Sequence, residues 1–419
     1  MKTFAMMVLG CKVNDYEATY LRNKLLNDYK EVTFKEVADI YIIFTCCVTN
    51  IAEAKTRKML HRARNLNPNA YIVAVGCLAQ IKGKNEEFKD IDLVIGSNHK
   101  DEIYDLINKH FIGNKLEELN KPKFEKLFFD HYPGKSRAFL KIQDGCNQFC
   151  SYCIIPYARG SERSGNYVDL INQANLLSKT NKELVLTGIH TGRYFDGKNH
   201  LYDLLLGLNE IKELKTIRLS SIEINEISNS IIDLMKNNNK LAHHLHIPVQ
   251  SASNKILKLM NRPYTIEEYI NRINYIRKEI PDISISTDLI VGFPLEDDEA
   301  FEETLNNLFK IKFSFIHVFH YARKNGTKAD SYSGHLDSSV KKQRVSKVFE
   351  LEKNIEIEFK KSFINKKLEL LIEKKDDQYV YGYVKQYFYV KAKGSGNIGD
   401  LVDVIIEEVN ELEVLGHVA

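Results

Sequence analysis

The sequence contains no apolar run long enough to span a membrane and no large excess of either charge. A bilayer span needs about 20 consecutive apolar residues, so we expect no transmembrane helix and no membrane partner. The start, MKTFAMMVLG, also lacks the basic segment, long apolar region and small-residue cleavage site of a secretory signal, which predicts a cytoplasmic protein. With a net charge of only +3, the composition neither requires nor excludes a nucleic-acid partner.

The sequence also lacks internal repeats and low-complexity tracts. Its 44% of hydrophobic and 27% of charged residues are typical of a soluble globular protein. A chain of 419 residues is too long for one hydrophobic core, because domains usually hold about 100–200 residues. We therefore expect three domains.

The N-terminal region alternates short apolar runs with helical stretches, and three of the runs end in cysteine: TFAMMVLGC, ADIYIIFTCC and AYIVAVGC. Near-continuous apolar strands separated by helices are typical of a parallel sheet that is buried on both faces. We therefore assign residues 1–115 to a parallel α/β domain. A charged connector with Pro122 and the Pro133–Gly134 pair follows over residues 109–135, with a domain boundary near Tyr132.

From Arg137 onward, six further strand-and-helix units follow, with polar residues of catalytic type at the strand ends. This pattern predicts a full or partial (β/α)6 barrel over residues 132–360, with its active site at the carboxyl ends of the strands. Residues 361–419 change to short alternating strands, which predicts a small antiparallel β-barrel or sandwich. The expected fold class is α/β with a small β-domain at the C-terminal end.

Seven cysteines in a cytosolic chain favour metal or redox chemistry over disulfides. Three of them, Cys146, Cys150 and Cys153, lie in the octapeptide CNQFCSYC directly after a predicted strand. Three thiolates in a short loop hold three irons of a cubic cluster and leave the fourth iron without a protein ligand. The CxxxCxxC spacing is the radical SAM signature, in which that iron binds S-adenosylmethionine, and Tyr152 before the last cysteine fits it.

A structural zinc ion is the alternative for this loop. Zinc sites usually have four closed ligands from paired knuckles, and no fourth cysteine lies nearby in the sequence. His190, after the next strand, would complete such a site, but a satisfied polar residue near the substrate is the simpler interpretation. We favour the iron–sulfur cluster.

The remaining cysteines stand in LGCKVN, FTCCVTN and VGCLAQ, each at the end of a predicted strand. Because the carboxyl ends of parallel strands meet at one crevice, Cys11, Cys77 and one member of the pair Cys46 and Cys47 should converge. They would hold a second cluster, whose open iron is a place for an exogenous sulfur species. Neighbouring residues in a strand point in opposite directions, so only one of the pair should face the crevice. The alternative is that these are ordinary buried core cysteines.

The chain resembles the methylthiotransferases, radical SAM enzymes with an N-terminal cluster domain, a central barrel and a C-terminal TRAM domain. The type with LGCKVN and CIIPYARG segments modifies threonylcarbamoyladenosine next to the tRNA anticodon, whereas the isopentenyladenosine type typically has GCQMN. A third type modifies an aspartate of a ribosomal small-subunit protein. The matching segments follow in order along nearly the whole chain: LGCKVNDYEA, FTCCVTN, VGCLAQ, KIQDGCNQFCSYCIIPYARGSERS, LTGIHTGRY, HLHIPVQSAS, LKLMNRPYT and TDLIVGFP.

The resemblance implies a radical enzyme that uses two 4Fe–4S clusters and S-adenosylmethionine. A radical formed from S-adenosylmethionine at the first cluster would take hydrogen from C2 of the adenine at position 37, and the second cluster would supply a methylthio group to that carbon. Tyr152 and residues at the strand ends would contact S-adenosylmethionine or substrate, although a permissive turn is the alternative for Gly188. The implied cluster ligands are Cys146, Cys150 and Cys153, and Cys11, Cys46 and Cys77. The implied cofactor-binding residues are Tyr152, Thr187, Gly188, Ser220, Glu223, Gln250 and Asp288.

One cluster ligand departs from the family pattern. FTCCVTN has Phe44 and Cys47 where the family often has Asn and Thr. The resemblance implies Cys46 as the ligand, which leaves Cys47 as a small buried residue. The implied partners are tRNA, S-adenosylmethionine and an electron donor such as a flavodoxin or ferredoxin.

Three regions are candidates for contact with RNA. The basic helix over Lys55–Arg64 is one, with a solvated surface as the alternative. Arg159, Arg163 and Arg262 lie near the predicted active-site loops, where they would bind phosphate, substrate or the carboxylate of S-adenosylmethionine. In the C-terminal domain, half of five alternating tyrosines should fill the core while the others stack on bases. These tyrosines are Tyr379, Tyr381, Tyr383, Tyr387 and Tyr389, and the nearby basic residues are Lys385, Lys391 and Lys393.

The leading hypothesis is a tRNA methylthiotransferase that acts on threonylcarbamoyladenosine. The enzymatic alternatives act on isopentenyladenosine or on a ribosomal aspartate. An alternative of another class is a non-catalytic RNA-binding protein with structural or redox-sensing clusters. The complete CxxxCxxC motif, together with the strand-end residues, argues against that last alternative.

Overall fold

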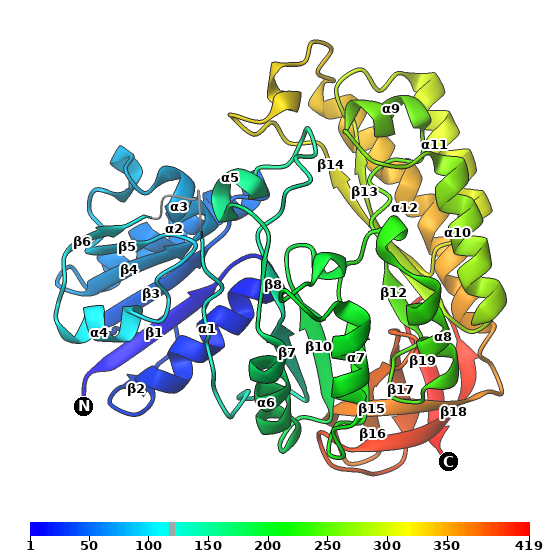
Figure 1. Cartoon of the computed structure of the whole chain (residues 1–419), viewed down its shortest axis with the longest axis horizontal. Helices are drawn as coiled ribbons and strands as arrows, with labels where there is room; N and C mark the ends of the chain where they lie inside the picture. Colours follow the sequence, from blue (N-terminus) through cyan, green and yellow to red (C-terminus); the bar gives the residue numbers. More distant parts are fainter. Residues whose placement is uncertain (117–121) are drawn as a thin grey trace.

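The computed structural model describes residues 1–116 and 122–419. Residues 117–121, which belong to the predicted connector, lie outside the described residues. Along the chain follow an N-terminal layer of sheet and helices, a curved set of strands wrapped by helices, and a small β-barrel (Figure 1). The small β-barrel lies near the end of the central domain where its first strands begin. In the described parts, no helix is long and apolar enough to cross a bilayer.

A six-stranded parallel sheet, in the order β2-β1-β3-β4-β5-β6, forms the N-terminal layer. Its strands β3 and β4 are buried along their whole length, because α1 and α4 cover one face of the sheet and α2 and α3 cover the other. The parallel α/β prediction is confirmed. The bounds are β1 Thr3–Val8, α1 Lys12–Leu25, β2 Lys30–Glu31, β3 Ile40–Thr45, α2 Asn50–Leu66, β4 Tyr71–Gly76, α3 Cys77–Lys82, β5 Leu93–Ile95, α4 Ile103–Asn108 and β6 Gly113–Lys115.

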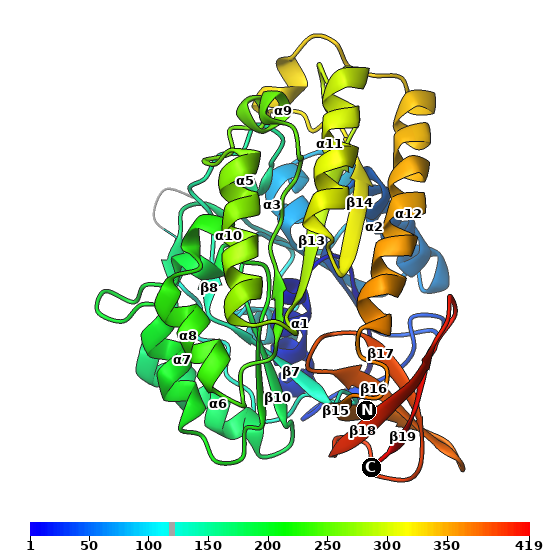
Figure 2. The same ribbon diagram turned by 90° about the vertical axis from the view of Figure 1, so that its right-hand side faces the viewer.

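The central domain contains two three-stranded parallel sheets, β7-β10-β11 and β12-β13-β14. Isolated parallel bridges from Ile217 to Leu241 and from Ser221 to His246 join them into one curved sheet. Helices lie along its outside, and Figure 2 shows α10, α11 and α12 side by side next to β13 and β14. No ladder between described residues joins β7 to β14, so the predicted barrel is confirmed in its partial form.

The strands of this domain are β7 Arg137–Lys141, β8 Gln143–Asp144, β9 Arg163–Ser164, β10 Glu183–Thr187, β11 Thr216–Leu219, β12 His244–His246, β13 Ser284–Val291 and β14 Phe315–His320. Its helices are α5 Ile155–Arg159, α6 Tyr167–Ser178, α7 Leu201–Asn209, α8 Asn229–Asn237, α9 Asn254–Leu259, α10 Ile266–Glu279, α11 Asp298–Ile311 and α12 Ser338–Lys361. The capping box of Thr265 and Glu268 fixes the start of α10, since each side chain accepts from the other residue's backbone N–H.

The C-terminal strands form a closed barrel in the order β15-β16-β17-β19-β18. Four of its five pairings are antiparallel and β17 pairs with β19 in parallel, because five strands cannot alternate direction all the way around a ring. The prediction of a small β-barrel is confirmed, with this one parallel pairing as the exception. The bounds are β15 Lys367–Lys375, β16 Tyr379–Val384, β17 Tyr389–Lys393, β18 Leu401–Val409 and β19 Val414–Val418.

The tyrosines of this barrel lie outside its core, so the prediction that half of them fill it was wrong. Val380, Val384 and Phe388 occupy the core instead. Residues that alternate along a strand face opposite sides, and the tyrosines all occupy the outward positions. Tyr389 is 41% exposed, which leaves an aromatic outer face on β16 and β17.

Candidate functional site

The predicted iron-binding loop lies between β8 and α5, at the carboxyl end of the first barrel strands. The N–H of Cys153 donates to the carbonyl of Cys150 at 2.9 Å, and the N–H of Cys146 donates to the carbonyl of Gly160 at 3.1 Å. Gly145 begins the loop at φ +71°, and a Cβ there would lie 2.0 Å from the carbonyl oxygen of Ser161, so only glycine fits. The loop is therefore folded back on itself.

The three thiols of this loop lie close together in a partly buried environment. Burial, with smaller contributions from the charges of Cys150 and Cys146, raises the pKa of the Cys153 thiol to about 12. Three neighbouring thiols in one short loop form a donor set that suits a metal cluster, because a coordinating metal deprotonates thiols even where burial disfavours the thiolate. The chemistry of the residues thus fits the predicted cluster.

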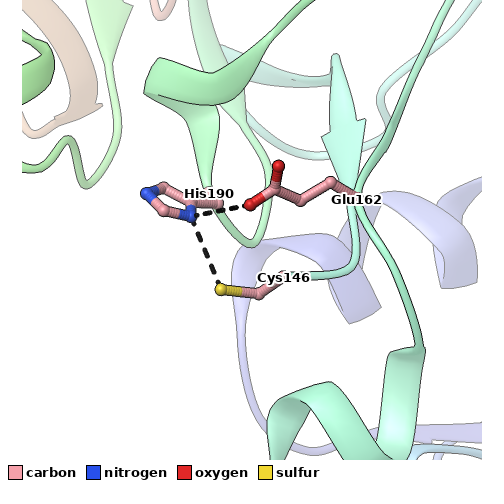
Figure 3. A group of neighbouring side chains, drawn as sticks. All are labelled: Cys146, Glu162 and His190. Atoms are coloured by element: carbon pink, nitrogen blue, oxygen red, sulfur yellow. Dashed lines mark hydrogen bonds and ion pairs between the residues drawn. The ribbon is translucent and has the colours of Figure 1, made fainter. Parts of the chain in front are cut away.

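His190 lies beside the first cysteine of this loop (Figure 3). Its Nδ1 is 3.4 Å from Cys146 Sγ and 3.5 Å from a Glu162 oxygen, and its Nε2 is 2.9 Å from Glu226. Burial lowers the pKa of His190, but the hydrogen bonds to these three residues outweigh it and raise the pKa to about 12. Because each ring nitrogen lies within ion-pair distance of a carboxylate, the contacts within the chain account for the position of His190 without a zinc ion.

Arg262 connects the loop to a predicted cofactor-binding residue. Its guanidinium donates to Cys150 Sγ at 3.4 Å, to the hydroxyl of Tyr264 at 3.1 Å, and to the carboxylate of Glu223. The structure therefore brings Glu223 to the cluster loop. Arg262 is only 9% exposed, and its contacts within the chain explain its position without the predicted phosphate or substrate.

Three other predicted cofactor residues lie at the ends of β10 and β11. Thr187 is buried, and its carbonyl accepts from the N–H of Ile142 at 2.9 Å. A Cβ on Gly188 would lie 3.0 Å from the carbonyl oxygen of Gln143, so a larger residue would make a tight contact there. The hydroxyl of Ser220 is buried and has no hydrogen-bond partner within the described chain. An unsatisfied buried hydroxyl at a strand end fits the polar groups of a cofactor.

The last three predicted cofactor residues have different surroundings. Gln250 adopts φ +61°, and its N–H donates to the carbonyl of Asp288 at 2.9 Å. Asp288 lies inside β13 rather than in the loop after it, and its carboxylate is 3.3 Å from His246 Nε2. Tyr152 packs against the apolar cluster of Ile256, Phe293 and their neighbours, so packing accounts for its ring.

The second cysteine group lies at the carboxyl ends of β1, β3 and β4. Cys11 caps α1, and Cys77 is the first residue of α3. Cys46 Sγ would lie 3.0 Å from a Cβ on Gly10, which places it against the turn that carries Cys11. Cys47 donates a hydrogen bond to Cys77. Four cysteines therefore meet here.

The prediction that only one of Cys46 and Cys47 faces this site was wrong. It assumed a strand, but β3 ends at Thr45 and both cysteines lie in the following loop. Strand alternation therefore does not separate their side chains.

Arg159 lies between the N-terminal layer and the central domain, where it contacts the second cysteine group. Its Nε donates to Cys77 Sγ at 3.1 Å, while its other nitrogens lie 3.2 Å from Glu17, 3.1 Å from Asp144 and 2.8 Å from Asn14. The side chain is fully buried, so the prediction that it binds phosphate or substrate was wrong. The hydrogen bond from Cys47 and the charge of Arg159 outweigh burial and lower the pKa of Cys77, which favours the thiolate that a metal needs.

The third predicted arginine and the basic helix have mixed surroundings. Arg163 pairs with Asp144 at 3.1 Å and donates to backbone carbonyls, so its role is structural. On α2, Arg57 and Arg64 pair with acidic residues of the same layer. The exposed basic residues of α2 are Lys55, Lys58 and Arg62.

The basic residues of the C-terminal barrel are partly engaged. Lys385 pairs with Glu369 at 2.9 Å and donates to the carbonyl of Asn239, so it docks the barrel against the central domain. Lys391 lies 3.4 Å from Glu413. Lys393 is exposed at the end of β17.

A cavity of about 570 Å³ opens inside the partial barrel. All three parts of the chain line it: Lys12 from α1, Arg137 and Arg218 from β7 and β11, and Tyr383 and Tyr387 from the C-terminal barrel. Tyr383 and Tyr387 were predicted as RNA contacts, but Lys12, Arg137 and Arg218 were not predicted as site residues. Of these three, only Lys12 carried a signal, its position next to Cys11, because nothing local in the sequence relates residues this far apart.

Comparisons with known proteins agree with this architecture. Residues 140–308 match the Radical SAM superfamily, and residues 3–96 match "Uncharacterized protein family UPF0004". Among solved structures, the radical S-adenosylmethionine methyltransferase TsrM from Kitasatospora setae has a TM-score of 0.55 at 12% identity, over 79% of this chain and 77% of that one. This likeness concerns the fold alone.

Two curated relatives match over nearly their full length. A threonylcarbamoyladenosine tRNA methylthiotransferase MtaB from Aquifex aeolicus is 36% identical over 96% of this chain and 99% of the relative. A tRNA-2-methylthio-N(6)-dimethylallyladenosine synthase from Thermodesulfovibrio yellowstonii is 34% identical over 100% of this chain and 98% of the relative. The chain therefore belongs to the tRNA methylthiotransferase family of radical SAM enzymes, whose shared cofactors are S-adenosylmethionine and a 4Fe–4S cluster.

Proposed function

We propose that this enzyme adds a methylthio group to C2 of N6-threonylcarbamoyladenosine at position 37 of tRNA, in the cytoplasm. The observation that carries the proposal is the presence of two separate cysteine sites in one chain, linked through Arg159, which follows the first site and donates to Cys77 of the second. A single radical site would be enough to activate the substrate. A second is needed where the chain must also hold the sulfur that is transferred.

The proposed cluster ligands divide between the two sites. When bound, the first cluster and S-adenosylmethionine supply a radical, and the second supplies sulfur. Cys46 is favoured over Cys47 because it lies against the turn that carries Cys11, whereas Cys47 acts as a donor to Cys77. The ligands are Cys146, Cys150 and Cys153 at the first site and Cys11, Cys46 and Cys77 at the second.

The surrounding side chains orient these groups. Ser220 offers an unpaired buried hydroxyl, and Glu223 is held near the first site by Arg262. His190, between two carboxylates, fixes the position of Cys146. We assign Ser220, Glu223, Gly188 and Thr187 to the S-adenosylmethionine side of the site. We assign Gln250 and Asp288 to the boundary with the cavity.

The three predicted segments have separate tasks in this proposal. Residues 1–115 hold the second cluster, residues 132–360 hold the first cluster and S-adenosylmethionine, and residues 361–419 bind RNA. The tyrosine face of β16 and β17 supports RNA stacking, and the exposed basic residues of α2 support phosphate contact. The proposed electron donor is a small redox protein such as a flavodoxin or ferredoxin.

Anaerobic reconstitution with iron and sulfide tests the two-cluster part. We expect about eight irons per chain for two cubic clusters, and fewer than about six would contradict the proposal. Mass spectrometry of tRNA nucleosides from cells with and without the gene tests the substrate. If the methylthio derivative of threonylcarbamoyladenosine is unchanged by loss of the gene, the proposed substrate is wrong, and loss of the isopentenyl derivative would identify the other type.

A further inference from the structure

Four basic side chains, Lys12, Arg137, Arg218 and Lys360, line the cavity inside the partial barrel, together with the carboxylates of Asp288 and Glu356. Arg137 lies 2.8 Å from Glu373, with its guanidinium 4.7 Å from the ring centre of Tyr383. Arg218 lies 2.8 Å from Glu183, with its guanidinium 4.8 Å from the ring centre of Tyr387. A carboxylate on one side and an aromatic ring on the other therefore hold each guanidinium in a fixed place at the cavity wall.

Lys12 is the third cation, and it differs from the two arginines. No described residue forms a hydrogen bond or an ion pair with its ammonium group, although the side chain lines the same cavity. A partly buried ammonium without an acceptor is costly, and the neighbouring guanidiniums increase that cost. The arrangement leaves Lys12 ready for an anionic group that enters the cavity.

The acidic and imidazole groups of the cavity do not supply that anion. The ligand atoms of His246, Asp288 and His317 lie within 4.8 Å of one another, a spacing that could hold a metal ion. Burial lowers the pKa of Lys12 and the charge of Asp288 opposes this shift, but Asp288 forms no ion pair with the ammonium group and is paired with His246. Glu356, the other carboxylate of the lining, is paired with Lys360, and the same cavity contains the positive charges of Lys12 and Arg218. These charges repel a divalent cation and attract an anion.

We propose that Lys12, flanked by Arg137 and Arg218, binds the carboxylate of the N6 substituent of the substrate adenosine. The inference rests on the proposed function and names the residues that select its substrate. A threonylcarbamoyl group ends in a carboxylate, whereas an isopentenyl group is a hydrocarbon that would leave Lys12 buried without a partner. A site built for a charged group rejects an analogue that lacks it, because its own polar groups then stay unpaired.

The position of Lys12 suits this role. It follows Cys11 directly in the chain and begins α1. A substrate whose carboxylate is bound by Lys12 would therefore have its adenine close to the second cysteine site. A cavity of this volume lies in the usual range for small-molecule sites, about 300–1,000 Å³. Tyr383 and Tyr387 form an aromatic wall that would pack against the rest of the substituent.

The test measures binding of anticodon stem-loop RNAs to the reconstituted protein. Three RNAs that differ only at residue 37 are compared. The residue is threonylcarbamoyladenosine in the first, the uncharged methyl ester of that nucleoside in the second, and unmodified adenosine in the third. We expect the ester to bind about 10- to 100-fold more weakly than the acid, the range of one hydrogen bond to a charged group. Lys12→Gln should weaken binding of the acid by a similar factor, leave the ester unchanged, and be largely rescued by Lys12→Arg. The matched control is Lys89→Gln, at an exposed lysine paired with Glu86, and it should leave the affinity for both the acid and the ester unchanged.

Two outcomes would overturn the inference. One is equal affinity of wild-type protein for the acid and the ester. The other is an equal loss with all three RNAs on Lys12→Gln, which would mean that Lys12 contacts a backbone phosphate. The ester comparison needs no variant, so it remains decisive if Lys12→Gln holds less iron. Either outcome, obtained with an enzyme that still methylthiolates threonylcarbamoyladenosine, refutes this inference while the proposed function stands.

Discussion

Replacing Arg159 by lysine removes the guanidinium that holds four partners together. Arg159 is fully buried between the N-terminal layer and the central domain, and it contacts Glu17, Asp144, Asn14 and Cys77. A lysine carries one point charge and reaches only one or two of these groups, whereas the planar guanidinium reaches all four. We therefore expect Arg159→Lys to fold with lower stability.

The size of the effect follows from what remains in the network. Breaking a buried ion pair outright costs about 3–5 kcal/mol. Lys141 stays in place, 2.6 Å from Glu17 and 2.7 Å from Asp144. Lys100 also remains 3.5 Å from Glu17 and Arg163 remains 3.1 Å from Asp144, so each carboxylate retains two cations. We expect a loss of about 3 kcal/mol in the free energy of unfolding, at the low end of that range.

Urea unfolding of the apoprotein, together with hydrogen exchange, measures this loss. The midpoint should fall, and the amides of α1 and α5 should lose protection because both helices carry members of the network. The matched control is Arg323→Lys, an exposed arginine paired with Asp330, which should change stability by less than about 0.5 kcal/mol. If Arg159→Lys is as stable as this control, the network does not hold the two domains together.

Other expectations concern the clusters and one carboxyl. Cys150→Ala should lower the iron content from about eight to about four per chain and abolish cleavage of S-adenosylmethionine; a full iron complement would contradict its assignment. Cys46→Ala should remove about four irons while Cys47→Ala removes none, and the reverse result would identify Cys47 as the ligand. Burial raises the pKa of Glu352 to about 7 in the folded protein, where its carboxylate accepts from the N–H of Ile316. The protonated Glu352 side chain stabilises the folded protein fully below the pKa of the unfolded chain, and this stabilisation is lost as pH rises through about 7. Glu352→Gln should therefore reduce the fall of the melting temperature between pH 5 and 8. A fall as steep as that of the wild-type protein would refute this.

The fold could be predicted where local pattern and tertiary environment agree. The continuous apolar runs of β3 and β4 are buried on both faces, as a parallel sheet requires. The loop from Cys146 to Cys153 is equally local, because its ligands are neighbours in the chain. Ser220 and Gly188 were implied by the resemblance to the family, and they lie at strand ends, where the active sites of such barrels are found.

What could not be predicted depends on contacts between distant segments. Arg159 looked like a substrate-binding arginine, but its partners Glu17 and Asp144 come from α1 and β8 and meet only in the folded chain. The relation of Cys46 to Cys47 depended on where β3 ends, and boundaries are the least certain part of a pattern. The outward tyrosines of β16 depended on which of two alternating faces points to the core.

The enclosure of the cavity has a consequence for the shape of the RNA that enters it. Its walls come from three parts of the chain, so a base that remains stacked between its neighbours cannot reach the interior. If the target nucleoside binds in this cavity as proposed, it must swing out of its strand, which costs a few kcal/mol and is easiest in a single-stranded loop. An adenosine held in a continuous duplex would therefore be a poor substrate even with the correct substituent, and an anticodon loop is the form of RNA that meets this requirement.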